Sequence, residues 1–367
     1  MNRRFVLQGL GSIGVANLLS GCGVSSGPRV SVQILRRSLP IQLLRQAKQA
    51  LSPKVQLRVA NSSSVAEIYG QLQKWSLSDT NSQDLRFFSL GDYWLSQAIR
   101  SGLIEPLTLP EAALGSIPGQ WRSLVQRSPQ GLVDPKGQIW GAPYRWGATV
   151  LVYRTDKFKR LDWELRDWAD LWRPKLSQRV SLLNQPREVI GMTLKSLGRS
   201  YNTPDLEQVQ PLRQKLLALH QQAKQYSSNK YLEPLILGDV WVAMGWSSDV
   251  IPALSQDENL GVIFPQSGSA IWADVWVKAK KSASDSAEFP VSQLTQQWVE
   301  HWWSDDVAND IARFTDAAPV IPIQADQSTL TPEDFDRSEF LLPLDPRAIE
   351  QYRQLWLEMR NSNSLEA

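Results

Sequence analysis

The sequence predicts an α/β protein that folds into two lobes. Segments typical of strands and of helices alternate along the chain both before and after residues 139–155, near its middle. The second half of that central stretch, residues 148–153, is an apolar, β-branched run typical of a strand. The chain has 367 residues, whereas single hydrophobic cores stop growing at about 250–300 residues. We therefore expect the central strand to leave one lobe and enter the other, with a ligand site beside this crossover. The alternative is an ordinary buried strand in one large domain.

The part of the chain before the central stretch is predicted to form three strand–helix units. The strands are expected at residues 30–35, 55–60 and 85–88, and the helices at 41–51, 64–75 and 92–101. Ser64 and Glu67 have the spacing of a capping box, and Gly102 ends the third helix. The proline-rich residues 106–129 are expected to be irregular. Short connections between such units favour a parallel α/β lobe.

The first half of the central stretch is predicted to be tight and turn-prone, because Gly141, Pro143 and Gly147 frame its aromatic and basic residues. After it we expect a second set of elements. The predicted strands cover residues 180–183, 241–246 and 270–277, with the apolar run 260–264 between the last two, and the predicted helices cover 186–197, 205–225, 294–303, 305–314 and 346–360. Residues 167–172 form a short amphipathic turn, and the polar residues 280–288 are consistent with a second crossing between the lobes.

The first residues are predicted to be an export signal and not part of the fold. Arg3 and Arg4 give a basic start, and the apolar run over residues 5–19 is too short to span a membrane. The run ends in Leu-Ser-Gly-Cys, which is typical of a bacterial lipobox with Cys22 as the lipidated residue. We expect a signal peptide over residues 1–21, a tether over 22–28, and a periplasmic, lipid-anchored protein. The paired arginines leave both the Sec and the twin-arginine export routes open.

The composition argues against several function classes. Removal of residues 1–21 takes away two arginines and leaves 37 basic and 37 acidic residues, so a nucleic-acid partner is not expected. Cys22 is the only cysteine, and His220 and His301 are far apart, so neither a disulfide nor a metal cluster is predicted. The sequence contains no nucleophile elbow, phosphate loop or dinucleotide fingerprint. We therefore expect no catalytic residues, no metal and no cofactor, and a binding protein instead of an enzyme.

Tryptophan is unusually frequent, with 16 residues in this chain. Most lie at helical spacings and are expected in the core, but Trp246 ends a predicted strand before a loop. Trp272 and Asp274 are two residues apart in another predicted strand and so share one of its faces. An aromatic ring beside a carboxylate is suited to an organic cation, because the ring quadrupole attracts the charge and the carboxylate pairs with it.

Six short motifs, in order along the chain, resemble the periplasmic spermidine/putrescine-binding proteins of ABC transporters. They are APYRWGAT (142–149), WADLWRP (168–174), PREVIGM (186–192), AMGWSSD (243–249), SAIWADV (269–275) and APVIP (318–322). The resemblance implies a two-lobed periplasmic binding fold of type II, with the ligand in a cleft between the lobes and delivery to an ABC permease in the membrane. It implies lobes over residues 29–143 plus 278–322 and over 144–277 plus 323–367, and we expect a monomer.

Carried over position by position, the resemblance implies a set of ligand-binding residues. They are Glu188, Trp246, Trp272 and Asp274, with Tyr93 from the first lobe, Trp94 beside it and Asp92 as a further carboxylate. This chain departs from the family at Gln185, where many members have an aspartate, and at Arg36 and Arg37 after the first strand.

The departures leave the ligand open. The favoured ligand is a polyamine or a similar cationic amine. A second interpretation keeps the fold and binds an anionic or zwitterionic molecule through Arg36, Arg37 or Arg145, since arginines that face the cleft would repel a polyamine. A third is a structural lipoprotein without a transport role, which would have no well-formed cleft.

Overall fold

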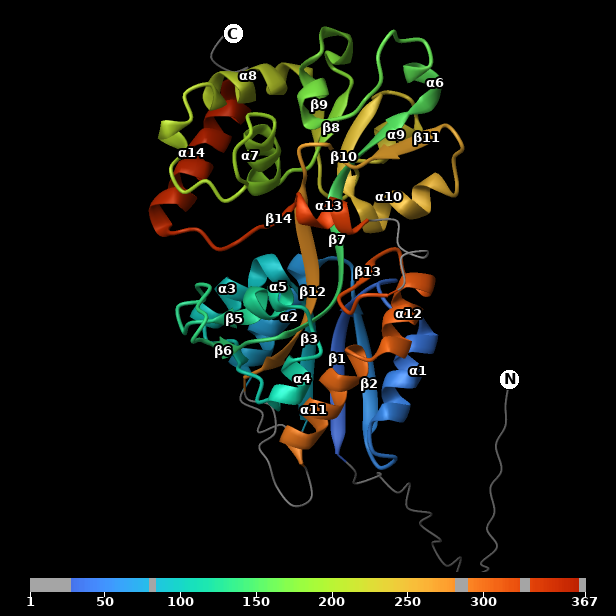
Figure 1. Cartoon of the computed structure of the whole chain (residues 1–367), viewed down its shortest axis with the longest axis vertical. Coiled ribbons are helices and arrows are strands. Elements are labelled where there is room, and N and C mark those ends of the chain that lie inside the picture. Colours follow the sequence, from blue (N-terminus) through green and yellow to red (C-terminus); the bar gives the residue numbers. More distant parts are fainter. Residues whose placement is uncertain (1–27, 79–83, 281–289, 324–330, 363–367) are drawn as a thin grey trace, which may run out of the picture.

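The computed structural model describes residues 28–78, 84–280, 290–323 and 331–362. Figure 1 shows two lobes, the first below and the second above, joined by a narrow middle through which long strands pass. The predicted two-lobed α/β architecture is confirmed.

The first lobe contains a mixed sheet flanked by helices. The strands β1, β2 and β3 are parallel, with β1 between the other two. Its elements are β1 (Arg29–Leu35), α1 (Ile41–Ala50), β2 (Gln56–Ser62), α2 (Val65–Leu77), β3 (Asp84–Gly91), α3 (Asp92–Arg100), β4 (Ile104–Glu105), α4 (Glu111–Leu114), α5 (Gly119–Val125), β5 (Gln126–Arg127), β6 (Gln138–Ile139), α11 (Val291–Trp302), α12 (Asp305–Phe314) and β13 (Ala318–Pro319).

Local sequence signals explain these elements. In β1, Val30, Val32 and Ile34 are buried and alternate with partly exposed residues, as one buried strand face requires. At the start of α2 the Ser64 side chain accepts a hydrogen bond from the Glu67 backbone N–H. The Glu67 carboxylate accepts from the Ser63 backbone N–H at 2.7 Å, one residue before the expected partner. The predicted cap at Ser64 therefore forms, but the hydrogen bond to the Glu67 carboxylate comes from Ser63 instead of from Ser64.

The second lobe contains a smaller sheet with helices around it. The strand β8 is parallel to β9 and β10, while β10 and β11 both pair with β7 in antiparallel orientation. Its elements are α6 (Thr155–Phe158), η1 (Trp168–Trp172), η2 (Pro174–Leu176), β8 (Val180–Leu182), α7 (Pro186–Lys195), η3 (Leu206–Gln208), α8 (Leu212–Gln222), β9 (Ala223–Tyr226), α9 (Glu233–Ile236), β10 (Val242–Trp246), α10 (Ser247–Leu254), β11 (Leu260–Ile263) and α14 (Pro346–Asn361).

Two long antiparallel strands, β7 (Ala142–Arg154) and β12 (Ala270–Ala279), run through the middle of the molecule (Figure 1). Backbone pairing is continuous through them, in the order β2-β1-β3-β12-β7-β10-β8-β9. The core is nevertheless split in two. On β7, Ala148 packs in the first core and Val150 in the second, and on β12 the change falls between Ala270 and Ile271.

The crossover lies closer to the second lobe than the sequence indicated, which is later along β7 and earlier along β12. Buried side chains of residues 144–148 and 271–277, which were expected in the second lobe, pack in the first core. Side chains of Phe335 and Phe340 also pack against the first core, although the C-terminal segment was assigned to the second. The exact division of the chain into lobes stays a prediction.

Three predictions of local structure are wrong. Residues 106–129, which were expected to be irregular, contain the helices α4 and α5 and the strand β5. From Ala142 to Ala148 the chain is a strand instead of a turn. It accommodates Pro143 at an irregularity in the pairing with β12, where Arg145 pairs with Asp274 and Pro143 with Val275. The helix expected over residues 205–225 is interrupted. The segment instead forms η3, a break, α8 and the strand β9. The break falls before α8 because Pro211, which precedes its first residue, has no backbone N–H to continue a helix from η3.

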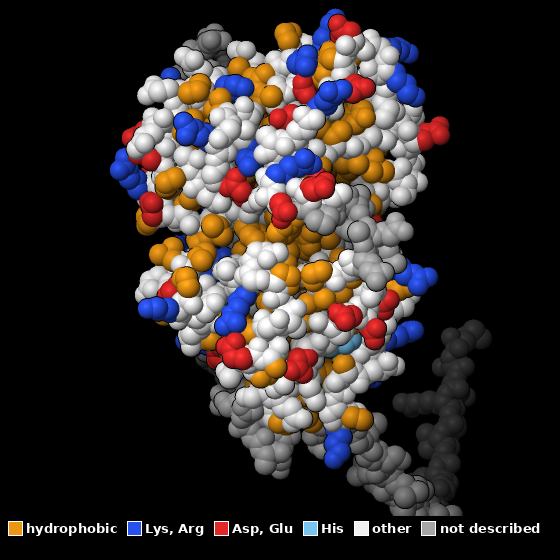
Figure 2. Space-filling model, in the orientation of Figure 1, with side chains coloured by type: hydrophobic (Ala, Val, Ile, Leu, Met, Phe, Trp, Pro, Cys, Tyr) orange, Lys and Arg blue, Asp and Glu red, His pale blue; other side chains and the backbone are white. Residues whose placement is uncertain are grey.

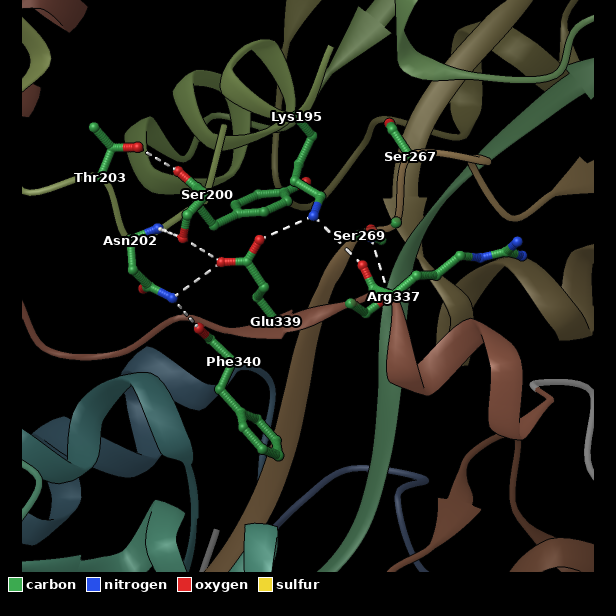
Figure 3. Close-up of polar contacts among 12 residues, drawn as sticks. Lys195, Ser200, Asn202, Thr203, Ser267, Ser269, Arg337, Glu339 and Phe340 are labelled. Carbon is green, nitrogen blue, oxygen red and sulfur yellow. Dashed lines mark hydrogen bonds and ion pairs between the residues drawn. The ribbon is translucent and has the colours of Figure 1, made fainter. Parts of the chain in front are cut away.

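A third crossing lies in the C-terminal segment, which contains α13 (Pro332–Asp336) and β14 (Glu339–Phe340). The strand β14 pairs with the start of β12. Figure 3 shows Lys195, Ser200 and Asn202 of the second lobe converging on this segment. Lys195 Nζ lies 2.9 Å from a Glu339 carboxylate oxygen, and Ser200 donates a hydrogen bond to the same carboxylate. These contacts fasten the segment to the second lobe before α14 begins.

Candidate ligand-binding site

One face of β7 carries the residues around which the candidate site is built. Arg145, Gly147 and Thr149 are each two residues apart, so they share one face of the strand. They lie across the change from the first core to the second. From Arg145 to Thr149 the strand covers about 13 Å, because a strand rises about 3.3 Å per residue. Each of the three lies against one of the residues singled out from the sequence.

Trp272 lies directly against Gly147. A Cβ atom at position 147 would come within 2.2 Å of Cζ2 of Trp272 and within 2.5 Å of Oγ of Ser247, so only glycine fits there. The Trp272 ring is partly exposed, while its Nε1 atom is buried without a hydrogen-bond partner in the described part of the chain. Gly147, which the sequence marked only as a turn residue, is therefore the residue that admits this ring.

Glu188 provides a buried carboxylate from the second lobe. It lies in the first turn of α7 and is 6% exposed. Thr149 Oγ1 donates to it at 3.0 Å, and Trp246 Nε1 donates at 3.3 Å. Burial raises the pKa of the Glu188 carboxyl to about 7, against the effect of these two hydrogen bonds. The structure thus brings together Glu188 and Trp246, which are 58 positions apart in the sequence.

Asp92 provides a buried carboxylate from the first lobe. It is the first residue of α3 and is 5% exposed. Its Oδ1 accepts a hydrogen bond from the Ala273 backbone N–H on β12 at 3.0 Å, which places Asp92 between Trp272 and Asp274 along that strand. Burial raises the pKa of the Asp92 carboxyl to about 6.

Asp274 is already paired with an arginine of the chain. Nε of Arg145 donates to Oδ2 of Asp274 at 2.7 Å, and a second guanidinium nitrogen lies 2.6 Å from the same oxygen. A third contact runs from Arg145 to the Ser38 backbone oxygen at 3.0 Å. The Arg145 guanidinium carbon lies 6.0 Å from the centre of the Trp272 ring. Asp274 and Trp272 therefore lie around the same cation, as their spacing indicated, but that cation belongs to the protein.

Tyr93 and Trp94 lie at the edge of the first lobe. Tyr93 is 50% exposed. Trp94 stacks on Tyr69 with ring centres 4.5 Å apart and meets Tyr93 edge-on. Tyr93 acts electrostatically on Arg187 of the second lobe, whose pKa is lowered by burial. Tyr93 thus lies near Arg187 of the second lobe, and the Trp94 ring packs edge-on against the Tyr93 ring.

The other departures from the family pattern lie outside this cluster of contacts. Arg36 and Arg37 are exposed in the turn after β1, and Arg37 has a positive φ of 66°. Gln185 is the N-cap residue of α7, and its side chain makes no capping hydrogen bond.

Sequence reasoning missed two residues of the site. Thr149 holds Glu188, and its position two residues after Gly147 on a strand was the available signal. Arg187 is buried beside Glu188 and donates to Asn202 Oδ1 at 2.9 Å and to the Leu342 backbone oxygen at 3.1 Å. Nothing in the local pattern separates Arg187 from a surface arginine.

Cys22 and the predicted signal peptide lie outside the described residues. In residues 28–78, 84–280, 290–323 and 331–362, no group of histidine, cysteine and carboxylate side chains could hold a metal ion. The helices described in these ranges are all too short or too polar to cross a membrane.

Two α/β lobes, joined by strands that continue from one into the other, define the class of two-lobed periplasmic binding proteins of type II. The spermidine/putrescine ABC transporter substrate-binding protein of Streptococcus pneumoniae has this fold, with a TM-score of 0.70 over 91% of this chain and 99% of that one, at 18% identity. The family model described as bacterial extracellular solute-binding protein matches residues 87–338. The chain belongs to this family, which confirms the resemblance and agrees with a binding protein instead of an enzyme.

Relatives whose names refer to a ligand match part of the chain at higher identity than that structure. The spermidine/putrescine-binding periplasmic protein 1 of Haemophilus influenzae is 27% identical over 185 residues, which are 50% of this chain and 48% of that protein. The putrescine/cadaverine-binding protein of Pseudomonas aeruginosa is 27% identical over 241 residues, which are 61% of this chain and 67% of that protein. The chain therefore spans about half to two thirds of the length of these relatives.

Proposed function

We propose that this protein is the extracytoplasmic solute-binding component of an ABC importer, and that it binds a polyamine or a similar cationic amine at the junction of its lobes. The observation that carries the proposal is a pair of buried carboxylates, Asp92 and Glu188, which come from different lobes. Among the described residues, neither forms an ion pair in the structure. A buried carboxylate is costly unless it is paired, and a ligand ammonium would supply the missing charge to each.

Aromatic side chains support a ligand with apolar segments between its charges. The rings of Trp246, at the end of β10, and Trp272, on β12, are partly buried, and Tyr93 at the edge of the first lobe is exposed. Methylene chains pack favourably on such rings, and an ammonium over a ring face gains about 0.5–2 kcal/mol. The names of the relatives refer to spermidine, putrescine and cadaverine, all of which are aliphatic amines.

The anionic interpretation has less support. Arg145 is neutralised by Asp274, and Arg36 and Arg37 lie in an exposed turn. An anion would also have to approach the carboxylates of Asp92 and Glu188.

The proposed location and partners follow from the sequence. The lipobox favours a lipoprotein that is anchored by Cys22 on the outer face of the membrane, as a monomer, near an ABC permease that receives the ligand.

Calorimetric titration tests the ligand class. Putrescine, cadaverine and spermidine are titrated into the protein, and amino acids and small anions serve as the alternatives. We expect an amine to bind, and Glu188→Gln to weaken it by about ten- to a hundredfold, since a lost charged hydrogen bond corresponds to about 1.5–3 kcal/mol.

The matched control is Glu164→Gln in the same lobe, because the Glu164 side chain is 77% exposed and pairs with the exposed Arg166. This control should leave amine affinity unchanged. Binding of an anion without any amine would contradict the proposal, and a protein that binds no solute would favour a structural role.

A further inference from the structure

The predicted cation site of this chain is filled by its own arginine. The sequence places a ring, Trp272, and a carboxylate, Asp274, where an ammonium group would fit. The structure places the Arg145 guanidinium against both, with hydrogen-bond contact to the carboxylate and 6.0 Å to the ring centre. Arg145 thus makes the two kinds of contact that a ligand cation would make.

The Arg145 guanidinium is held in place on several sides. It contacts Asp274 through two nitrogen atoms and the Ser38 backbone oxygen through a third. The side chains of Arg145 and Asp274 are 5% and 8% exposed. Burial is the largest single effect on Arg145 and disfavours its charged form, but the charge and hydrogen bond of Asp274 together with the effect of Tyr144 exceed it and raise the pKa of the guanidinium. A buried arginine with this many partners is a permanent part of the site.

We infer that Arg145 is a resident cation that occupies Asp274, and that it makes the site select amines with two cationic centres over amines with three. This inference rests on the proposed function. With Asp274 neutralised, Asp92 and Glu188 are the buried carboxylates in the described part of the chain that form no ion pair, since Asp84 and Asp334 also pair with arginines. A third ammonium would have no buried carboxylate partner there and would be repelled by Arg145.

Two further carboxylates also act electrostatically on Arg145. Asp249 and Asp316 both have exposed surface, but partial burial of the carboxyl raises the pKa of each, and Asp249 accepts a hydrogen bond from the Tyr231 hydroxyl at 2.6 Å. Asp249 already has the Tyr231 hydroxyl as a partner, and solvent screens the charge of the exposed Asp316 more than that of a fully buried carboxylate. They therefore do not replace Asp274 as a partner for a third ammonium.

Titration of putrescine and spermidine into the wild-type protein and into Arg145→Gln tests the inference. The wild type should bind putrescine more tightly than spermidine. Arg145→Gln exposes the Asp274 charge to the ligand, so the ratio of the two Kd values should shift toward spermidine by about tenfold, as expected for one charged hydrogen bond. Arg145→Lys keeps a cation opposite Asp274 and should restore the wild-type order.

A charge-free double variant covers the case in which Arg145→Gln does not fold, because neutral replacement of both partners of a buried ion pair is often tolerated. Arg145→Met with Asp274→Asn should weaken putrescine binding less than Glu188→Gln does. An equal loss, or an unchanged Kd ratio in folded Arg145→Gln, would overturn the inference while amine binding itself stands. A wild-type protein that binds neither amine would instead refute the proposed function.

Discussion

At the scale of single residues, burial of charge dominates this protein. Asp92 and Glu188 are nearly inaccessible and have raised pKa values, while Asp274 is equally buried but has a guanidinium partner. Carboxylates that are buried without a cation cost stability in the empty protein. We expect ligand binding to remove that cost. The same buried carboxylates therefore lower the stability of the ligand-free protein and raise its affinity for a cationic ligand.

Glu188→Gln should stabilise the ligand-free protein at pH 8 while it weakens amine binding. The folded protein holds the Glu188 proton until about pH 7, whereas the unfolded chain releases it near the ordinary value of 4.5. The wild type therefore loses stability as pH rises through that interval, and the variant avoids a cost on the order of 1–3 kcal/mol. Urea unfolding at pH 4.5 and pH 8 measures the difference, which should be large only at pH 8. Equal effects at both pH values would mean that the carboxyl is not buried as described.

Gly147→Ala should displace Trp272 and lower both stability and affinity. The added methyl group would lie 2.2 Å from the ring, which cannot move away as a flexible chain end could. Overpacking of this kind costs about 1–3 kcal/mol. Gly70→Ala is the matched control, since no atom lies within 4 Å of its added Cβ and alanine favours the helix in which Gly70 lies. Thermal unfolding and amine titration of both variants check this, and a Gly147→Ala protein with wild-type values would contradict the packing.

At the scale of elements, β7 and β12 perform two tasks at once. They join the lobes, and they carry Arg145, Thr149, Trp272 and Asp274 to the junction. The C-terminal segment gives a third connection, which is held by polar contacts instead of long strand pairing (Figure 3). Figure 2 shows hydrophobic side chains at the surface of the narrow middle between the lobes. We expect these connections to determine how the lobes move.

Glu339→Gln should loosen the C-terminal crossing. The change removes the charge partner of Lys195, whose side chain is 14% exposed. Partial exposure of the pair limits the expected loss of unfolding free energy to about 1 kcal/mol. Faster hydrogen exchange is expected at the backbone amides of Glu339 and Leu342, which donate to Ser269 and Asn202. The exposed Glu333 provides the control variant, Glu333→Gln. Unchanged exchange in Glu339→Gln would show that the crossing does not depend on this cluster.

At the scale of the whole molecule, two separate cores share one run of paired strands. Because each core is built from its own set of residues, we expect each lobe to keep its packing if the lobes move relative to each other. A ligand that contacts Asp92 in one lobe and Glu188 in the other would bind most tightly to one relative placement of the lobes. Such a ligand should therefore stabilise the molecule as a single unit.

Cys22→Ser should release the protein from the membrane. The lipobox predicts that the Cys22 thiol receives the lipid, and serine cannot form the same thioether. Fractionation of cells that express the wild type and the variant should find the wild type with membranes and the variant in the soluble extracytoplasmic fraction. Retention of Cys22→Ser in the membrane fraction, with unchanged processing, would refute the anchor.

The sequence by itself determined the α/β class, most of the elements and the family. These depend on hydrophobic periodicity, caps and short motifs, which are properties of residues close together in the sequence. The placement of Trp272 and Asp274 on one face of a strand is also such a property, because they are two residues apart. Only the tertiary structure decided which cation these two residues hold. Arg145 and Asp274 are 129 positions apart and meet because β7 and β12 are neighbours in the sheet. The role of Gly147 also comes from a contact between strands, because the Trp272 ring on β12 packs against it. The position of the crossover likewise depends on which core the side chains of β7 and β12 enter, and this is set by contacts with residues distant in the sequence.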